Sequence, residues 1–160
     1  MTKSETQTLQ EAHQHFARTL NGEVWELLQK PDRSKSEDEG MLCAAYASCY
    51  YWLRAGTGLH HQRAEWLIAR VCSELRLAES TLGHAARCLE LTAEHGDQMK
   101  DFDRAYAYEG LARANALAGN QDEALKFIQL AEETGQAIGD MEDRRIFFGD
   151  LGTGNWHGLR

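Results

Sequence analysis

The sequence predicts an all-α protein of about seven helices, and three observations carry this prediction. The 160 residues contain one proline, Pro31, so almost nothing interrupts a helical run elsewhere in the chain. Apolar residues recur at three- and four-residue spacing along most of the sequence. No segment shows the sustained alternation of a half-buried strand. Because about 150 residues suffice for one buried core, we expect a single domain over residues 1–160.

The N-terminal part is predicted to hold one divergent helix, over residues 5–29, and then a linker. A single apolar stripe at helical spacing indicates the helix. Residues 30–40 contain the proline and dense charge, which are typical of a linker. The next helix should begin with a capping box, in which Ser36 accepts a hydrogen bond from the backbone N–H of Glu39 and the Glu39 carboxylate bonds back.

The central part is predicted to consist of two helical repeats, over residues 41–98 and 99–139. Glycines and small polar residues divide it into helices that span about 41–55, 60–78, 80–95, 100–118 and 120–139. We expect Ser80 to cap the third of these helices and Gly119 to end the fourth. Asp140 should cap a last, short helix over residues 140–148. The final segment, 149–160, is rich in glycine and is expected to be a flexible tail.

Two segments of the central part repeat each other. Residues 85–91 (AARCLEL) and 124–130 (ALKFIQL) superimpose at an offset of 39 residues, and Gly96 then falls on Gly135. Upstream of these segments the offset becomes 40, which places Val71 on Leu111. Repeats of this length are typical of helical solenoids, in which each helix pair buries its face against the next pair.

Residues 105–138 resemble a tetratricopeptide repeat (TPR). The matching positions carry large residues, a turn glycine and small residues where two helices cross: Tyr108, Leu111, Ala112, Gly119, Ala124 and Ala131. Asn115 stands where the family has an aromatic residue, and residues 65–98 match less well. The spacing of about 40 residues is similar to the longer repeats of bacterial regulators and small bacterial proteins. This resemblance implies an antiparallel helix-pair solenoid, a TPR-like α-α superhelix.

The resemblance also implies a function. In TPR arrays the first helix of each pair lines a concave groove, and six side chains are expected to lie there as partner-binding residues: Trp66, Ser73, Arg76, Tyr106, Glu109 and Arg113. Arg113 and Tyr106 are suited to hold a carboxylate or to stack on a partner. Equally, Trp66 and Tyr106 are suited to pack between helices. We therefore expect a non-catalytic module that binds a protein or peptide, with a homodimer as a second way to cover an exposed end.

Two other function classes stay open. A small-ligand-binding regulatory protein would need an enclosed apolar pocket near Tyr46, Tyr50 and Trp66. The aromatic cluster around Tyr46 and Tyr50 is more typical of a core than of a ligand cage. A metal-dependent enzyme would use His84 and Cys88, together with a third ligand.

The sequence contains few local motifs with the spacing of metal ligands. Three pairs have the four-residue spacing of a shared helix face: Glu11 with His15, His61 with Glu65, and His84 with Cys88. Zinc needs three or four convergent ligands, and no single stretch offers more than two. No nucleophile motif or phosphate-binding loop occurs either. The sequence therefore predicts no enzyme, no metal site and no cofactor.

The composition and the net charge argue against some classes of binding partner. Seventeen basic against 25 acidic residues give a net charge of −8, which argues against nucleic acid because such binding depends on Lys and Arg. No stretch approaches the ~18 apolar residues that span a bilayer, and residues 1–7 lack the pattern of a signal peptide. The cysteines are expected to be reduced and buried, in a cytoplasmic protein: Cys43, Cys49, Cys72 and Cys88.

Overall fold

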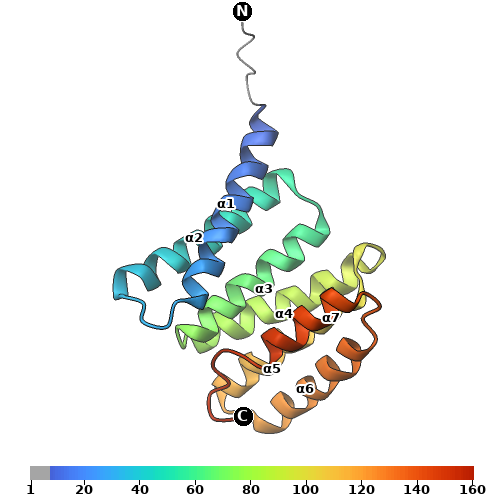
Figure 1. Ribbon diagram of the computed structural model, residues 1–160. Coiled ribbons are helices and arrows are strands. Elements are labelled where there is room, and N and C mark those ends of the chain that lie inside the picture. Colours follow the sequence, from blue (N-terminus) through green and yellow to red (C-terminus); the bar gives the residue numbers. More distant parts are fainter. Residues whose placement is uncertain (1–7) are drawn as a thin grey trace, which may run out of the picture.

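The computed structural model describes residues 8–160, and within them the chain forms seven α-helices and one short 3₁₀ helix, with no strand (Figure 1). The prediction of an all-α protein is therefore confirmed. The elements are α1 (Leu9–Gln29), α2 (Lys35–Ala55), α3 (Gly58–Glu74), α4 (Ala78–Glu94), η1 (Gly96–Gln98), α5 (Asp101–Ala118), α6 (Gln121–Gln136) and α7 (Met141–Leu151).

The helices pack mainly against their neighbours in the chain. The closest pairs are α1 with α2, α3 with α4, and α5 with α6, while α4 also packs against α5 and α2 against α3. In addition α3 contacts α5, and α7 packs against both α5 and α6 (Figure 1). Because α3 and α5 touch each other directly, their facing side chains form a continuous surface.

A row of aromatic contacts joins the odd-numbered helices. Trp25 of α1 stacks on Trp66 of α3 with ring centroids 5.8 Å apart. Trp66 meets Tyr106 of α5 edge to face at 4.9 Å, and Tyr106 meets Phe147 of α7 at 5.0 Å. Aromatic pairs of this kind contribute about 0.5–1.5 kcal/mol each beyond the area that they bury. The row fixes the order of these four helices.

Small residues lie where helices approach closely. Ala112, Ala124 and Ala131, which the TPR resemblance singled out, are fully buried. Gly135 of α6 has the same role against α7, because a Cβ atom there would lie 2.5 Å from Cε1 of Phe147. Protein interiors are packed to high density, so these positions leave no room for a longer side chain.

The start of α2 differs from the predicted one. The capping box is formed by Ser34 and Glu37, not by Ser36 and Glu39: Glu37 N donates to Ser34 Oγ at 3.1 Å, and Ser34 N donates to Glu37 Oε2 at 2.8 Å. Both pairs have the spacing of a capping box, and the one nearer to the proline begins the helix. The charged residues that follow Ser34 therefore belong to α2 and not to a linker.

Some of the other helix boundaries differ from the predicted ones, and some agree with them. The predicted start of the first helix at residue 5 lies outside the described residues, and α1 begins at Leu9 after a capping box on Thr8. Ser80 lies inside α4, whose N-cap is Leu77. The predictions at the other end are confirmed: Gly119 ends α5 with a φ of 82°, and Asp140 accepts a hydrogen bond at the start of α7.

The cysteines are all free, but they are not all buried. Cys49, Cys72 and Cys88 lie in the core, whereas Cys43 is exposed on α2, so the prediction is wrong at that position. None of the helices in residues 8–160 combines the length and the hydropathy needed to cross a membrane.

The C-terminal segment differs from the loosely attached tail that we expected. Helix α7 continues to Leu151, and residues 152–160 (the C-terminal segment below) fold back against the helices. Trp156 is 6 % exposed, and its indole Nε1 donates to the carbonyl of Leu151 at 3.1 Å. Glycines permit the turns, but the buried tryptophan holds the segment in place.

Candidate functional site

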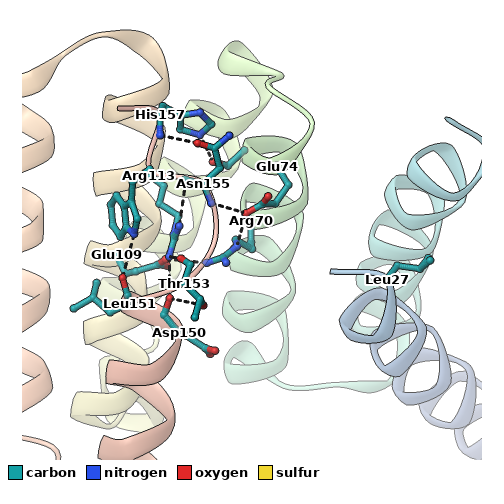
Figure 2. Close-up of polar contacts among 12 residues, drawn as sticks. Leu27, Arg70, Glu74, Glu109, Arg113, Asp150, Leu151, Thr153, Asn155 and His157 are labelled. Carbon is teal, nitrogen blue, oxygen red and sulfur yellow. Dashed lines mark hydrogen bonds and ion pairs between the residues drawn. The ribbon is translucent and has the colours of Figure 1, made fainter. Parts of the chain in front are cut away.

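Five of the six side chains predicted to line a groove lie along the surface that α3 and α5 share. These are Trp66, Ser73, Tyr106, Glu109 and Arg113, and all five are buried. The sixth, Arg76, follows the end of α3 in a left-handed conformation with a φ of 60° and is exposed. Figure 2 shows that the C-terminal segment runs across this surface between α3 and α5.

Glu109 is at the centre of the site and is fully buried. Its carboxylate accepts a hydrogen bond from Trp66 Nε1 at 2.7 Å and is paired with Arg113 one helical turn later. Arg70 of α3 also approaches, with Nη1 3.4 Å from Oε1 of Glu109. A buried carboxylate is costly unless it is paired and hydrogen-bonded, so these groups form one interdependent unit.

Arg113 connects this unit to the C-terminal segment through main-chain carbonyls (Figure 2). Its Nη2 donates to the carbonyl oxygens of Asp150 at 2.9 Å and Thr153 at 2.8 Å, and its Nη1 donates to that of Asn155 at 3.3 Å. Burial lowers the pKa of the Arg113 guanidinium, and the Glu109 carboxylate acts in the opposite direction. A guanidinium stays charged in proteins, so these are charge-assisted hydrogen bonds.

The segment makes further contacts on both sides of Arg113. The ring of Trp156 covers the guanidinium, with the Arg113 Cζ 4.1 Å from the ring centroid. On the α3 side, the backbone N–H of Asn155 donates to Oε1 of Glu74 at 3.1 Å. The segment is thus recognised at main-chain donors and acceptors, and Trp156 supplies the apolar anchor.

The side chain of His157 also joins the C-terminal segment to α3. Its Nε2 forms a hydrogen bond of 2.9 Å with Oγ of Ser73. Its Nδ1 is buried and has no partner among the described residues. Burial, followed by the charge of Arg76, lowers the pKa of His157. The neutral imidazole is therefore the form that fits this position.

Tyr106 joins the end of α7 to the same site. Its hydroxyl donates to Oδ2 of Asp150 at 2.5 Å, and burial together with this carboxylate raises its pKa. Gly154 lets the chain pass close to α3, because it adopts a φ of 76° and an added Cβ would overlap Nη2 of Arg70.

A second polar cluster lies on the other side of α3, between α2 and α4. Nδ1 of His84 is 2.6 Å from Oε2 of Glu65, and Nε2 of His61 is 3.4 Å from Oε1 of the same carboxylate. Burial acts to raise the pKa of Glu65, but the two histidines outweigh it and the pKa is lowered. Cys49 of α2 completes the group, and burial raises the pKa of its thiol to about 12.

This cluster includes only half of the metal-ligand pair that the sequence suggested. His84 belongs to it, but Cys88 does not: the group whose ligand atoms lie close enough to share one ion, among the described residues, is Cys49, His61 and Glu65. Cys49 was missed because it lies on a different helix and no local spacing connects it to α3.

The aromatic residues proposed for a small-ligand pocket do not enclose one together. Tyr46 and Tyr50 are 41 % and 51 % exposed, so the expectation that they belong to the core is wrong. Trp66 lines a pocket of about 190 Å³ instead, between α1, α3 and α5, together with Trp25 and Tyr106. Pockets for small molecules usually measure roughly 300–1,000 Å³, so this pocket is small for that purpose.

Comparisons with known proteins do not assign the site. The chain matches no protein-family model, no curated protein and no solved structure.

Proposed function

We propose that this protein is a TPR-like helical-repeat module that binds a peptide segment between α3 and α5 without catalysing a reaction, and that its C-terminal segment is the intramolecular occupant of that groove. The observation that carries the proposal is the set of three hydrogen bonds from buried Arg113 to main-chain carbonyls, two in the C-terminal segment and one at the end of α7. Carbonyl oxygens are present in every peptide, so another segment with the same path can accept the same hydrogen bonds.

The internal repeat supports the solenoid part of this proposal. The offset of 40 residues aligns Trp66 with Tyr106, and both rings lie at the contact between α3 and α5. The offset of 39 residues aligns Ala85 with Ala124, and both methyl groups are fully buried. At these two aligned positions the residues of α3–α4 and α5–α6 thus have the same burial, as expected for stacked helix pairs.

The chemistry of the groove supports a peptide as its ligand. The guanidinium of Arg113 faces carbonyl oxygens, while the carboxylate of Glu74 accepts a backbone N–H from Asn155. Donor and acceptor groups on opposite walls match the alternating polarity of a main chain. The rigid helices present these groups without ordering a loop, which reduces the entropic cost of binding.

A peptide added in trans tests the proposal. The probe is a fluorescently labelled peptide with the sequence of residues 149–160, and the receptor is the full chain carrying Trp156→Ala. A covalently attached segment competes at an effective concentration of roughly millimolar. We therefore expect Trp156→Ala to bind the probe at least ~10-fold more tightly than the wild-type chain, measured by fluorescence polarisation.

Two controls make the test specific. A probe in which alanine replaces the tryptophan should bind weakly to either chain, because it lacks the ring that covers Arg113. Leu125→Ala, which truncates an exposed side chain of α6, should leave probe binding as in the wild type. If the Trp156→Ala chain is folded by circular dichroism and binds neither probe, the groove does not bind peptides and the proposal is wrong.

A further inference from the structure

The cluster between α2, α3 and α4 has the composition of a transition-metal site. His61 and Glu65 are one turn apart on the same face of α3, and Cys49 approaches them from α2. One thiol sulfur, one imidazole nitrogen and one carboxylate oxygen all lie within 4.8 Å of one another. Thiolate, imidazole and carboxylate are the three ligand types that proteins use for zinc.

The distances fit a metal after small side-chain movements. Zinc–ligand bonds of about 2.0–2.3 Å in a tetrahedron place the ligand atoms roughly 3.3–3.8 Å apart. His61 Nε2 and Glu65 Oε1 are already 3.4 Å apart, so the two α3 ligands need no rearrangement. The sulfur lies within 4.8 Å of the other two ligand atoms, so a movement of about 1 Å brings it into this range.

The neighbours of Glu65 orient it for this role. A carboxylate can only accept, so Nδ1–H of His84 donates to Oε2 of Glu65 at 2.6 Å. Nε2 of His84 then accepts from the hydroxyl of Tyr46 at 2.8 Å. This chain of hydrogen bonds occupies one carboxylate oxygen and leaves the other, Oε1, directed at His61. Metal ligands are commonly held by outer groups of this kind.

The arrangement also leaves a route from solvent. The side chains of His61 and His84 are 21 % and 25 % exposed, whereas Cys49 is buried at the inner end of the cluster. The two imidazoles therefore lie at the solvent side of the cluster and are its most accessible ligand groups. Three protein ligands leave a fourth position for water or a small ligand, the pattern of open rather than purely structural zinc sites.

We propose that Cys49, His61 and Glu65 bind one Zn²⁺ ion, with His84 as a positioning residue for Glu65. On binding, the Cys49 S–H bond breaks, the electron pair stays on sulfur to form the S–Zn bond, and the proton leaves to solvent. This site is independent of the peptide groove, because its residues face α2 and α4 and not α5.

Cobalt titration of the full chain tests the proposal. The protein is stripped of metal with a chelator and titrated with Co²⁺ alone, which reports a thiolate ligand by a charge-transfer absorption band. We expect one Co²⁺ per chain with this band, and displacement by Zn²⁺, which binds such sites more tightly than cobalt. Cys49→Ser should abolish the band, and His84→Gln should weaken Co²⁺ binding about 10- to 100-fold while keeping the band.

A matched cysteine on the same helix provides the control. Cys43→Ser changes an exposed thiol of α2 and should leave both the band and the affinity unchanged. If Cys49→Ser does not fold, His61→Ala changes a partly exposed ligand and must also weaken Co²⁺ binding strongly. A wild-type chain that shows no thiolate band, or a band that persists in folded Cys49→Ser, overturns the proposal.

Discussion

The polar groups on the two sides of α3 differ in their burial and in the groups that they bind. Toward α5, Glu109 and Arg113 are almost completely removed from solvent, and Arg113 is hydrogen-bonded to main-chain carbonyls of the C-terminal segment. Toward α2 and α4, Glu65 is paired with two partly exposed histidines, and these contacts join side chains only. Buried charges of this kind can recognise the main chain of a peptide, whereas partly exposed side chains can bind a partner such as an ion.

The largest effect is expected from breaking the buried pair. Arg113→Met leaves Glu109 buried without its main counter-charge and removes two hydrogen bonds to the C-terminal segment and one to the end of α7. Removal of one partner from a buried ion pair typically costs about 3–5 kcal/mol, so we expect a loss of this size in the free energy of unfolding, measured in urea. Arg87→Met, which removes exposed ion pairs on α4, is the control and should change stability little. Equal effects of the two substitutions would contradict the assignment.

The close passage of the C-terminal segment over α3 predicts the next largest effect. Gly154 and Gly158 both have a positive φ, of 76° and 83°, but only Gly154 lies against Arg70. Gly154→Ala should therefore destabilise the chain by about 1–2 kcal/mol more than Gly158→Ala, because both variants have the same backbone strain and only Gly154→Ala displaces the largely buried ends of the Arg70 and Glu74 side chains. Thermal unfolding of the two variants measures the difference, and identical melting temperatures would show that the segment does not approach α3.

On the other side of α3, truncation of a histidine should have a smaller effect. His84→Ala in metal-free protein removes hydrogen bonds to Glu65 and Tyr46 that lie partly in solvent. A loss of about 1 kcal/mol is expected, since a typical hydrogen bond contributes about 0.5–1.5 kcal/mol and solvent can partly replace both of these bonds. Urea unfolding of His84→Ala and Arg113→Met under the same conditions tests this difference between the two sides of α3. A loss in the free energy of unfolding of His84→Ala as large as that of Arg113→Met would contradict it.

The smallest effect concerns pH at the C-terminal segment. The docked state lowers the pKa of His157, so the free segment binds a proton more readily. The stabilisation that His157 gives to the folded chain is therefore complete above the ordinary histidine pKa of about 6.5. It is lost as the pH falls through that value toward the lower pKa of His157 in the docked segment. Because His157 is partly exposed, solvent screening limits the effect to about 0.5 kcal/mol or less. The wild type should lose stability relative to His157→Gln between pH 8 and pH 5.5; a pH-independent difference would contradict this.

The sequence was sufficient for the helices because the relevant signals are local. Periodic apolar residues, one proline, Gly119 and Asp140 each act within a few residues of the chain. Where two capping boxes overlapped, at Ser34 and Ser36, the sequence did not distinguish them, since both have the same spacing.

The occupant of the groove was not predictable in the same way. The register of the repeat placed Glu109 and Arg113 on one surface, but nothing local indicates that residues 152–160 return to it. One signal was available: Trp156 is a large aromatic residue in a glycine-rich segment, and flexible segments contain few aromatic residues. Cys49 is a similar case, because its partners on α3 and α4 are close only after folding.

The central claim, that the C-terminal segment is an exchangeable occupant of the groove, is tested most directly by amide hydrogen exchange. The full wild-type chain is labelled with ¹⁵N, and exchange of residues 153–157 is followed by NMR with and without unlabelled peptide 149–160 at ~10 mM, above the effective concentration of the attached segment. We predict that the hydrogen-bonded amides among them, those of Thr153, Asn155 and His157, are protected in the free protein and exchange markedly faster with the peptide present, while α3 and α5 keep their protection. Protection of residues 153–157 that equals that of α3 and α5 and does not change with the peptide would contradict the claim and make the segment a fixed part of the fold.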